Sequence, residues 1–415
     1  MKLFLHSVIM ALVMLSANNH RLEAQKVKTG LEVLDGTDFE LLKGKRVGLI
    51  TNPTGIDSKF RSNIEIFSQT GKFKLVALFG PEHGVRGDYA AGDYVSNFTD
   101  PVTGIPVYSI YGKTRKPTRE MLEGIDVLVY DIQDIGSRSY TYISTLGLAM
   151  EAAAENNIRF VVLDRPNPLG GIKMEGLLTK PGFFSFVSQF PIPYIHGLTV
   201  GELAYFLNNE GLLANGVKCD LVVVTMKGWK RKMTFEKTGL PWVLTSPHIP
   251  HYYSPDYYPV SGILGELGVF NIGVGYTLPF QLFAAEWIQA ELLTDHLDKL
   301  NLPGIKFRPV HFSPFYSVSK GVMVHGVQVY ITDPGMANLT LVQFYVLQEC
   351  HKLWPEKNVF DLCDPSRLNM FDKVCGSDTI RKEFSKNFTV ASIENLWMQE
   401  IAGFREKARG YFLYK

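Results

Sequence analysis

The sequence predicts an α/β protein with a doubly wound parallel sheet and a second, smaller α+β domain. From about residue 45 to residue 225, short β-branched apolar runs alternate with longer helical patterns, which is typical of parallel strands covered by helices. After residue 229 the pattern changes to Pro-rich and Tyr-rich loops, a Gly-rich stretch and mixed strands and helices. The strands of the first region are expected at residues 46–50, 74–79, 127–130, 159–163 and 221–225.

Three helices are expected between these strands, at residues 58–70, 140–156 and 199–210. The third has the clearest start, because Thr199 is followed three residues later by Glu202, as in a capping box. We therefore divide the chain into a leader at residues 1–24, a Rossmann-like domain at 25–228 and a smaller α+β domain at 229–415.

The first 24 residues have the layout of a secretory signal peptide. Lys2 supplies a positive start, residues 3–15 are apolar apart from His6 and Ser7, and Ala24 is a small residue at the expected cleavage site. The alternative is an uncleaved anchor, but the apolar run is shorter than the roughly 20 residues that span a bilayer. We predict a cleaved signal peptide and an exported protein, either periplasmic or extracellular.

The composition excludes several classes of protein. The 415 residues include 42 Lys and Arg against 41 Asp and Glu, so no basic field is present to hold nucleic acid. A hydrophobic fraction of 46% excludes a disordered chain, and no later segment predicts a stable membrane insertion. The four cysteines form no C-x-x-C pair and are interpreted as buried apolar residues, although a Cys363–Cys375 disulfide stays open.

Polar side chains follow four of the predicted strands, at the edge where ligands of open parallel sheets bind. Each is also typical of an ordinary turn or a structural ion pair, but together they predict a site in one crevice. The candidates after the successive strands are Asn52; Glu82, His83 and Arg86; Asp131, Asp134 and Arg138; and Asp164, Arg165 and Asn167.

Cofactor motifs are missing from these turns. Residues 51–55 (TNPTG) lack the glycines of a dinucleotide-binding turn, and the chain has neither a phosphate-binding P-loop nor a G-x-S-x-G nucleophile elbow. Glu82 and His83 with the three aspartates could suit a metal ion, but no spaced histidine motif supports this alternative. We therefore expect no cofactor.

The remaining possibility is acid catalysis by a carboxyl group. A glycosidase needs a protonated carboxyl group beside the leaving oxygen, and Glu82, in a Gly-Pro-Glu-His-Gly turn after an apolar strand, is the best-placed candidate. Two alternatives use the same cleft: a catalytically silent saccharide-binding protein of the cell wall, and a metal-dependent hydrolase.

Five segments around these residues resemble the NamZ-type exo-β-N-acetylmuramidases, a bacterial family formerly known only as a domain of unknown function. They are residues 48–55 (GLITNPTG), 78–88 (LFGPEHGVRGD), 106–112 (PVYSIYG), 131–138 (DIQDIGSR) and 163–171 (LDRPNPLGG). The resemblance implies a Rossmann-like catalytic domain whose cleft is closed by the smaller domain. It also implies removal of terminal β-linked N-acetylmuramic acid from the non-reducing end of peptidoglycan fragments.

The same resemblance assigns the general acid to Glu82, within the family's Pro-Glu-His-Gly motif, with His83 beside it. The partner group stays open between Asp131, Asp134, Asp164 and the N-acetyl group of the substrate, as does the choice between retention and inversion.

N-acetylmuramic acid carries a lactyl carboxylate, for which an arginine fork is the preferred partner. Arg86, Arg138 and Arg165 are the expected candidates. The chain departs from the family pattern at Val274 and Gln281, where relatives have an arginine and a glutamate, so its sugar specificity is open.

Overall fold

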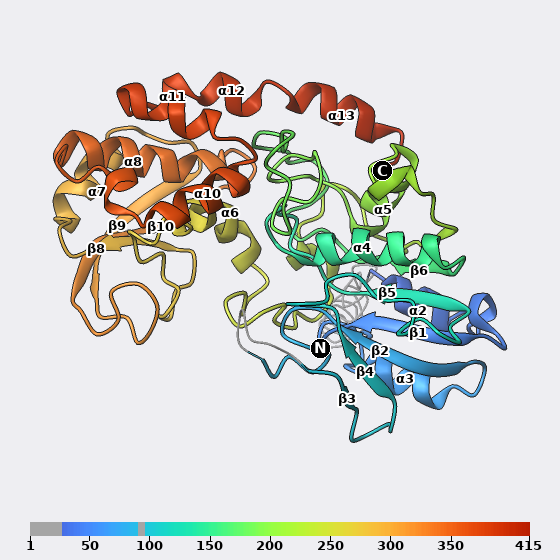
Figure 1. Ribbon diagram of the computed structural model, residues 1–415. Helices are drawn as coiled ribbons and strands as arrows, with labels where there is room; N and C mark the ends of the chain where they lie inside the picture. The colour runs from blue at the N-terminus through green and yellow to red at the C-terminus, as the bar shows by residue number, and fades with distance from the viewer. Residues whose placement is uncertain (1–26, 90–95) are drawn as a thin grey trace, which may run out of the picture.

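The computed structural model describes residues 27–89 and 96–415. The signal peptide expected at residues 1–24 lies outside the described residues. Figure 1 shows a larger part built on a parallel sheet and a smaller part built on an antiparallel sheet, with the last helices running from the smaller part back over the larger one. Among the helices of the described ranges, none combines the length and the apolar character needed to cross a bilayer.

The larger sheet has seven strands in the described part of the chain, in the order β3-β4-β2-β1-β5-β6-β7. All neighbours pair in parallel except β3, which runs antiparallel to β4 at one edge. Without β3, this is the Rossmann order, with its topological switch point between β1 and β5. The strands are β1 (Arg46–Thr51), β2 (Lys74–Gly80), β3 (Phe98–Thr99), β4 (Pro106–Ser109), β5 (Val127–Asp131), β6 (Arg159–Leu163) and β7 (Leu221–Val224).

The five predicted strands are confirmed, each to within one residue at its ends. The sequence analysis missed β3 and β4. Strand β4 is short and starts with Pro106, a residue that lacks the N–H for a ladder hydrogen bond and weakens the strand signal.

Four helices accompany this sheet: α2 (Gly30–Asp35), α3 (Asn63–Gln69), α4 (Tyr142–Glu155) and α5 (Val200–Asn209). The capping box of α5 is present as predicted, with Thr199 and Glu202 bonded to each other's backbone. Helix α3 begins five residues later than expected. Asp57 accepts hydrogen bonds from the backbone of Lys59 and Arg61, which holds that stretch as a turn until Ser62 caps the helix.

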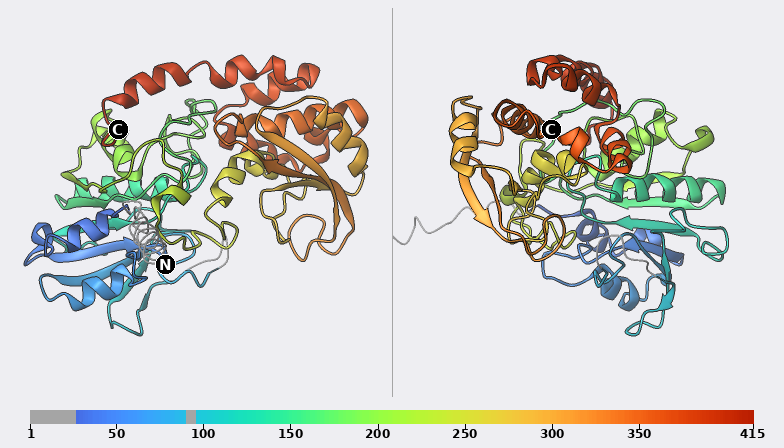
Figure 2. Two further views of the ribbon diagram at one scale, coloured as in Figure 1. Left: turned by 180° about the vertical axis from the view of Figure 1, so that it is seen from behind. Right: turned by 60° about the vertical axis from the view of Figure 1, so that its left-hand side comes forward.

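The smaller part contains an antiparallel sheet in the order β8-β10-β9, packed against helices (Figure 2). Its strands are β8 (Leu282–Ala285), β9 (Ile305–Phe312) and β10 (Val324–Ile331). Its helices are α6 (Ser254–Gly265), α7 (Ala290–Asp298), α8 (Val342–Leu353), α9 (Val359–Leu362), α10 (Pro365–Cys375), α11 (Thr379–Asn387), α12 (Glu394–Met398) and α13 (Ile401–Arg409). Short 3₁₀ turns lie at Glu40–Leu42, Ala214–Gly216, Phe235–Thr238, Leu339–Leu341 and Val390–Ser392.

The chain between the two parts packs on the larger one. Lys227 forms a bridge with Lys28, and the rings of Trp229 and Tyr414 meet edge to face at 5.0 Å. We call residues 229–253, which precede α6, the covering segment. It starts by packing on the larger domain and is not part of the smaller sheet. The four cysteines are free and buried, so the Cys363–Cys375 disulfide is not formed.

Candidate active site

The carboxyl ends of the strands bring most of the predicted residues to one edge of the sheet. A small cavity of about 20 Å³, with room for about one water molecule, lies at the switch point between β1 and β5. Thr54, Gln133 and Arg165 line it from the strand ends, and Phe235 and Trp242 from the covering segment. Glu82, which follows β2, does not line this cavity. The grouping of all the predicted residues around one crevice stays a prediction.

Glu82 is half-buried, and a hydroxyl group holds each of its carboxyl oxygens. The Tyr111 hydroxyl donates to Oε1 and the Thr141 hydroxyl donates to Oε2, both at 2.9 Å. Burial and the neighbouring Glu82 raise the pKa of Tyr111, so its phenol stays a proton donor. Within the described ranges, Glu82 makes no ion pair. Its carboxyl group is therefore oriented but not neutralised by a cation.

The turn that carries Glu82 has an unusual backbone. His83 and Gly84 have φ of 71° and 74°, the left-handed region that non-glycine residues seldom adopt. His83 is buried, and its Nδ1 lies 3.0 Å from the carbonyl oxygen of Tyr89. A neutral ring in this position carries its proton on Nδ1 and keeps Nε2 as an acceptor. The strained turn thus fixes both the path of Glu82 and the tautomer of His83.

Three tyrosines, the buried Tyr140 and Tyr142 and the partly buried Tyr258, pack together near Glu82. The ring of Tyr140 lies 4.9 Å from that of Tyr142 and 5.7 Å from that of Tyr258, both edge to face. Burial is the main cause that raises the pKa of Tyr142 and Tyr258, with a further contribution from the charge of Glu82. These phenols are therefore neutral, and they present apolar rings and hydroxyl groups to this side of the site.

The smaller part reaches the site through Tyr316, from the loop between β9 and β10. Its hydroxyl lies 2.6 Å from Nε2 of His248, which belongs to the covering segment. Burial, and then the nearby His83, lower the pKa of His248. Sequence reasoning did not single out Thr141, His248 or Tyr316 as site residues. His248 and Tyr316 lie in loops without a periodic pattern. Thr141 lies at the start of the helix predicted at residues 140–156, next to α4, and nothing in its position pointed to a contact with Glu82.

Asn52 and Asp134 have buried polar atoms without a hydrogen-bond partner among the described residues, Nδ2 of Asn52 and Oδ1 of Asp134. The remaining polar atom of each side chain accepts a hydrogen bond. Oδ1 of Asn52 accepts from the Thr54 backbone at 3.0 Å, and Oδ2 of Asp134 accepts from the Gly136 backbone at 2.7 Å. Nε2 of His196 lies 3.5 Å from the same Asp134 oxygen. Asp134 therefore keeps one buried oxygen without a hydrogen-bond partner among the described residues.

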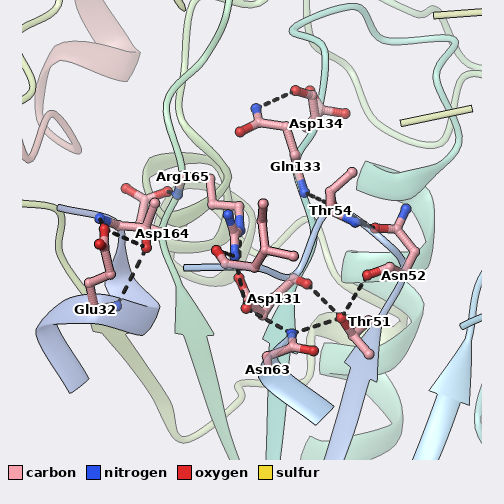
Figure 3. Close-up of polar contacts among 12 residues, drawn as sticks. Glu32, Thr51, Asn52, Thr54, Asn63, Asp131, Gln133, Asp134, Asp164 and Arg165 are labelled. Atoms are coloured by element: carbon pink, nitrogen blue, oxygen red, sulfur yellow. Dashed lines mark hydrogen bonds and ion pairs between the residues drawn. The ribbon is translucent and has the colours of Figure 1, made fainter. Parts of the chain in front are cut away.

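Asp131 is engaged in a buried ion pair with Arg165 (Figure 3). The guanidinium donates through Nε at 2.6 Å and Nη2 at 3.0 Å, and Asn63 donates to the same carboxylate at 2.8 Å. Asp131 is 0% exposed. Both partners are satisfied by each other, which points to a structural role.

Asp164 also has its oxygens occupied. It accepts hydrogen bonds from the Thr199 hydroxyl, the Gly201 backbone and the Tyr414 hydroxyl. Burial raises its pKa to about 7. Asn167 donates to the carbonyl oxygen of Leu198, 31 residues later in the chain, and accepts from the backbone of Leu169 within its own loop. These contacts support the strand-end turns, and a part for either residue in substrate binding stays a prediction.

Two of the expected arginines are committed elsewhere. Arg138 is 0% exposed and donates to the carbonyl oxygens of Leu177, Ile192 and Val374. It lies inside the protein and does not reach the strand edge. Arg86 lies at the surface and forms an ion pair with the buried Asp100 at 2.8 Å. The guanidinium of Arg138 is therefore enclosed by carbonyl oxygens, and the charge of Arg86 is balanced by Asp100.

The residues in the described part of the chain contain no group of three or more His, Cys, Asp or Glu side chains arranged to hold a metal ion. Glu82 and Asp134, which the metal alternative places together, have separate partners: hydroxyl groups for Glu82, and a backbone amide and His196 for Asp134.

Two family models match this chain over most of its length. A family model described as the N-terminal part of the exo-β-N-acetylmuramidase NamZ matches residues 47–253, and the model of its C-terminal part matches residues 257–414. The chain belongs to the NamZ family. It is 44% identical over 398 residues to the peptidoglycan β-N-acetylmuramidase NamZ of Bacillus subtilis, covering 96% of this chain and 94% of that protein.

Two solved structures of DUF1343 family proteins from Bacteroides fragilis are also similar. One is 57% identical with a TM-score of 0.91, the other 26% identical with a TM-score of 0.74, and each comparison covers 94% of this chain and 99% of the other. The two-part NamZ fold is therefore shared along nearly the whole chain. The two family models meet between residues 253 and 257, at the start of α6.

Proposed function

We propose that this protein is a glycoside hydrolase that removes terminal β-linked N-acetylmuramic acid from the non-reducing end of peptidoglycan fragments, with Glu82 as the proton donor. The observation that carries the proposal is the position of Glu82 at the sheet edge, with both carboxyl oxygens held by hydroxyl groups. Family membership and the similarity to the Bacillus subtilis enzyme support the reaction class.

The environment of Glu82 suits a proton donor. Tyr111 and Thr141 orient the carboxyl group without adding a positive charge, and the left-handed turn at His83 fixes its backbone. A group that must protonate a leaving oxygen needs such a fixed geometry more than it needs a strong partner.

Asp134 is the best supported of the three candidate partners. Asp131 and Asp164 have their oxygens taken by Arg165 and by Tyr414, Thr199 and Gly201, whereas Asp134 keeps Oδ1 without a partner among the described residues. Glu82 and Asp134 both help to raise the pKa of the partly buried Tyr258, after the larger effect of burial. The N-acetyl group of the substrate remains the alternative nucleophile.

We also propose that the protein is exported by the signal peptide at residues 1–24. Peptidoglycan lies outside the cytoplasmic membrane, so an enzyme acting there needs export. Mass spectrometry of the purified mature protein tests this, with cleavage after Ala24 as the expected result.

The enzymatic test uses a chromogenic β-N-acetylmuraminide and a defined disaccharide with terminal N-acetylmuramic acid, with the released sugar identified by mass spectrometry. The wild-type protein should release it, and Glu82→Gln should abolish release while melting at an unchanged temperature. Glu123→Gln changes an exposed glutamate of the same domain and serves as the control. Full activity of Glu82→Gln would remove Glu82 from the mechanism.

The same assay separates the alternatives. Saccharide binding without release by the wild-type protein would favour a silent binding protein. Loss of activity in EDTA with recovery on adding Mn²⁺ or Zn²⁺ would favour a metal-dependent hydrolase.

A further inference from the structure

N-acetylmuramic acid differs from N-acetylglucosamine by a lactyl ether, whose carboxylate is charged at neutral pH and suits a cation as partner. The three arginines predicted for this role already have partners: Arg138 is enclosed by carbonyl oxygens, Arg165 is paired with Asp131, and Arg86 with Asp100. A further arginine, Arg115, lies near Glu82 without such a partner among the described residues.

Arg115 is connected to Glu82 by two aromatic rings. Its guanidinium carbon lies 4.5 Å from the centroid of the Phe186 ring. The Phe186 ring lies 6.1 Å from the ring of Tyr111, whose hydroxyl donates to Glu82. The charge of Arg115 also acts on the Tyr111 hydroxyl, whose pKa it lowers against the larger effects of burial and Glu82. The guanidinium is therefore near the acid group but separated from it.

Arg115 is exposed and uncommitted. In residues 27–89 and 96–415 its side chain makes no hydrogen bond and no ion pair, only the contact with Phe186. The neighbouring Lys116 differs, because it pairs with Glu155 at 2.6 Å and Glu151 at 3.5 Å. A guanidinium resting on an aromatic ring is held by its face and keeps its N–H edges free for a carboxylate.

The lactyl ether is on C3 of the sugar, and the bond to be broken is at C1, so the carboxylate lies several ångströms from the oxygen that Glu82 would protonate. A cation that binds this carboxylate therefore does not contact Glu82 directly. The contacts of Arg115 meet this condition, because the rings of Phe186 and Tyr111 connect it to Glu82.

We propose that Arg115 binds the lactyl carboxylate of the terminal N-acetylmuramic acid and is a specificity-determining residue of this enzyme. The proposal rests on the proposed function. Arg115 takes no part in proton transfer; its free N–H edge forms a charge-assisted pair with the carboxylate, which a sugar without the lactyl group cannot offer. The fixed position over Phe186 limits the entropy lost on binding.

The test compares two chromogenic substrates, the β-N-acetylmuraminide and the same compound with its lactyl carboxylate converted to a methyl ester. The ester keeps the size of the group but removes its charge. The wild-type enzyme should prefer the free acid. Arg115→Ala should lower kcat/KM for the acid by roughly 10- to 100-fold, the usual effect of losing a hydrogen-bonded charge pair, and leave the ester nearly unchanged.

Three further variants separate binding from structure. Arg115→Lys keeps a point charge without the fork and should retain part of the preference, while Arg115→Glu should prefer the ester. Arg119→Ala removes an exposed arginine four residues away that lines a hollow with Glu155 and Asn156 at the far end of α4; it should behave as the wild type. The loss in Arg115→Ala should appear mainly in KM.

Equal losses on both substrates would overturn the proposal, because they would show that Arg115 only supports Phe186 and Tyr111. An unchanged preference would overturn it as well. If the wild-type protein cleaves neither substrate, the proposed function fails by itself. In that case, calorimetry measures the affinity of the wild-type protein and of Arg115→Ala for free N-acetylmuramic acid. A loss of affinity in Arg115→Ala supports the binding role of Arg115, and an unchanged affinity refutes it.

Discussion

The hydroxyl of Tyr414 donates a 2.5 Å hydrogen bond to the carboxylate of Asp164, 250 residues earlier in the chain. The same hydroxyl accepts from the backbone of Met226 at 2.9 Å. One residue before Tyr414, the backbone of Leu413 donates to the buried Glu202. The end of the chain thus closes the larger domain, although α6 to α13 belong to or lead from the smaller part (Figure 1). The two parts are therefore joined in two ways. The chain leads from the larger part into α6, and the C-terminal residues return to the larger part and bond to it.

Tyr414→Phe should destabilise the whole protein. The change removes a buried hydroxyl that satisfies Asp164 and Met226, so we expect a loss of about 1–3 kcal/mol in the free energy of unfolding. Urea denaturation measures it. Tyr411→Phe, which removes a bond to the partly exposed Glu210, is the matched control and should cost less. Equal stabilities of the Tyr414 variant and the wild type would contradict the role of this contact.

Thr141→Val should slow catalysis without weakening substrate binding. The substitution keeps the shape of the side chain but removes the donor to Oε2 of Glu82, which leaves one carboxyl oxygen unoriented. We expect kcat to fall by about 10-fold, the size of a lost hydrogen bond to a charged group, with little change in KM. The control is Thr114→Val, three residues after Tyr111 in the chain, because the Thr114 hydroxyl makes no hydrogen bond in the described part of the chain. A rise in KM at unchanged kcat would argue against the orienting role.

Asp134→Asn and Asp131→Asn should separate activity from stability. Asp134 keeps a free oxygen, so its amide variant should fold normally and lose activity. Asp131→Asn leaves the buried Arg165 without a counter-charge, which should lower stability by about 3–5 kcal/mol. Thermal unfolding and the chromogenic assay on both variants measure the two effects. Full activity in the Asp134 variant would return the partner role to the N-acetyl group of the substrate.

Asp256→Asn should stabilise the protein at alkaline pH only. Burial raises the pKa of Asp256 to about 7, while Lys173 lowers it by less. A carboxyl group whose folded pKa is raised favours the folded state below its unfolded pKa of about 4 and loses that contribution as pH rises to about 7. The variant, which does not titrate, should therefore melt near the wild type at pH 4 and above it at pH 8.

The control for this comparison is Asp298→Asn, an exposed aspartate at the end of α7. Its difference from the wild type should stay constant with pH. Because Asp164 is present in all three proteins, its own titration cancels from the differences. A melting difference for Asp256→Asn that does not grow between pH 4 and pH 8 would refute the prediction.

The local pattern of the sequence determined the elements of the larger domain and the position of Glu82. Five strands, the start of α5 at Thr199 and the turn after β2 follow from β-branched runs, a capping box and Gly-Pro punctuation, all of which act between residues close in the chain. The strand order then places the carboxyl ends at one edge, as expected for a parallel sheet.

The roles of the charged residues at that edge were decided only by the tertiary structure. Arg138 meets Val374, Asp164 meets Tyr414, and Arg165 meets Asp131 through contacts 236, 250 and 34 residues apart. A sequence shows that an arginine follows a strand, but not which distant group satisfies its charge, because burial and pairing are set by how the remaining chain packs. For the same reason Arg115, unremarkable in the sequence, stands out only once Phe186 and Tyr111 lie beside it.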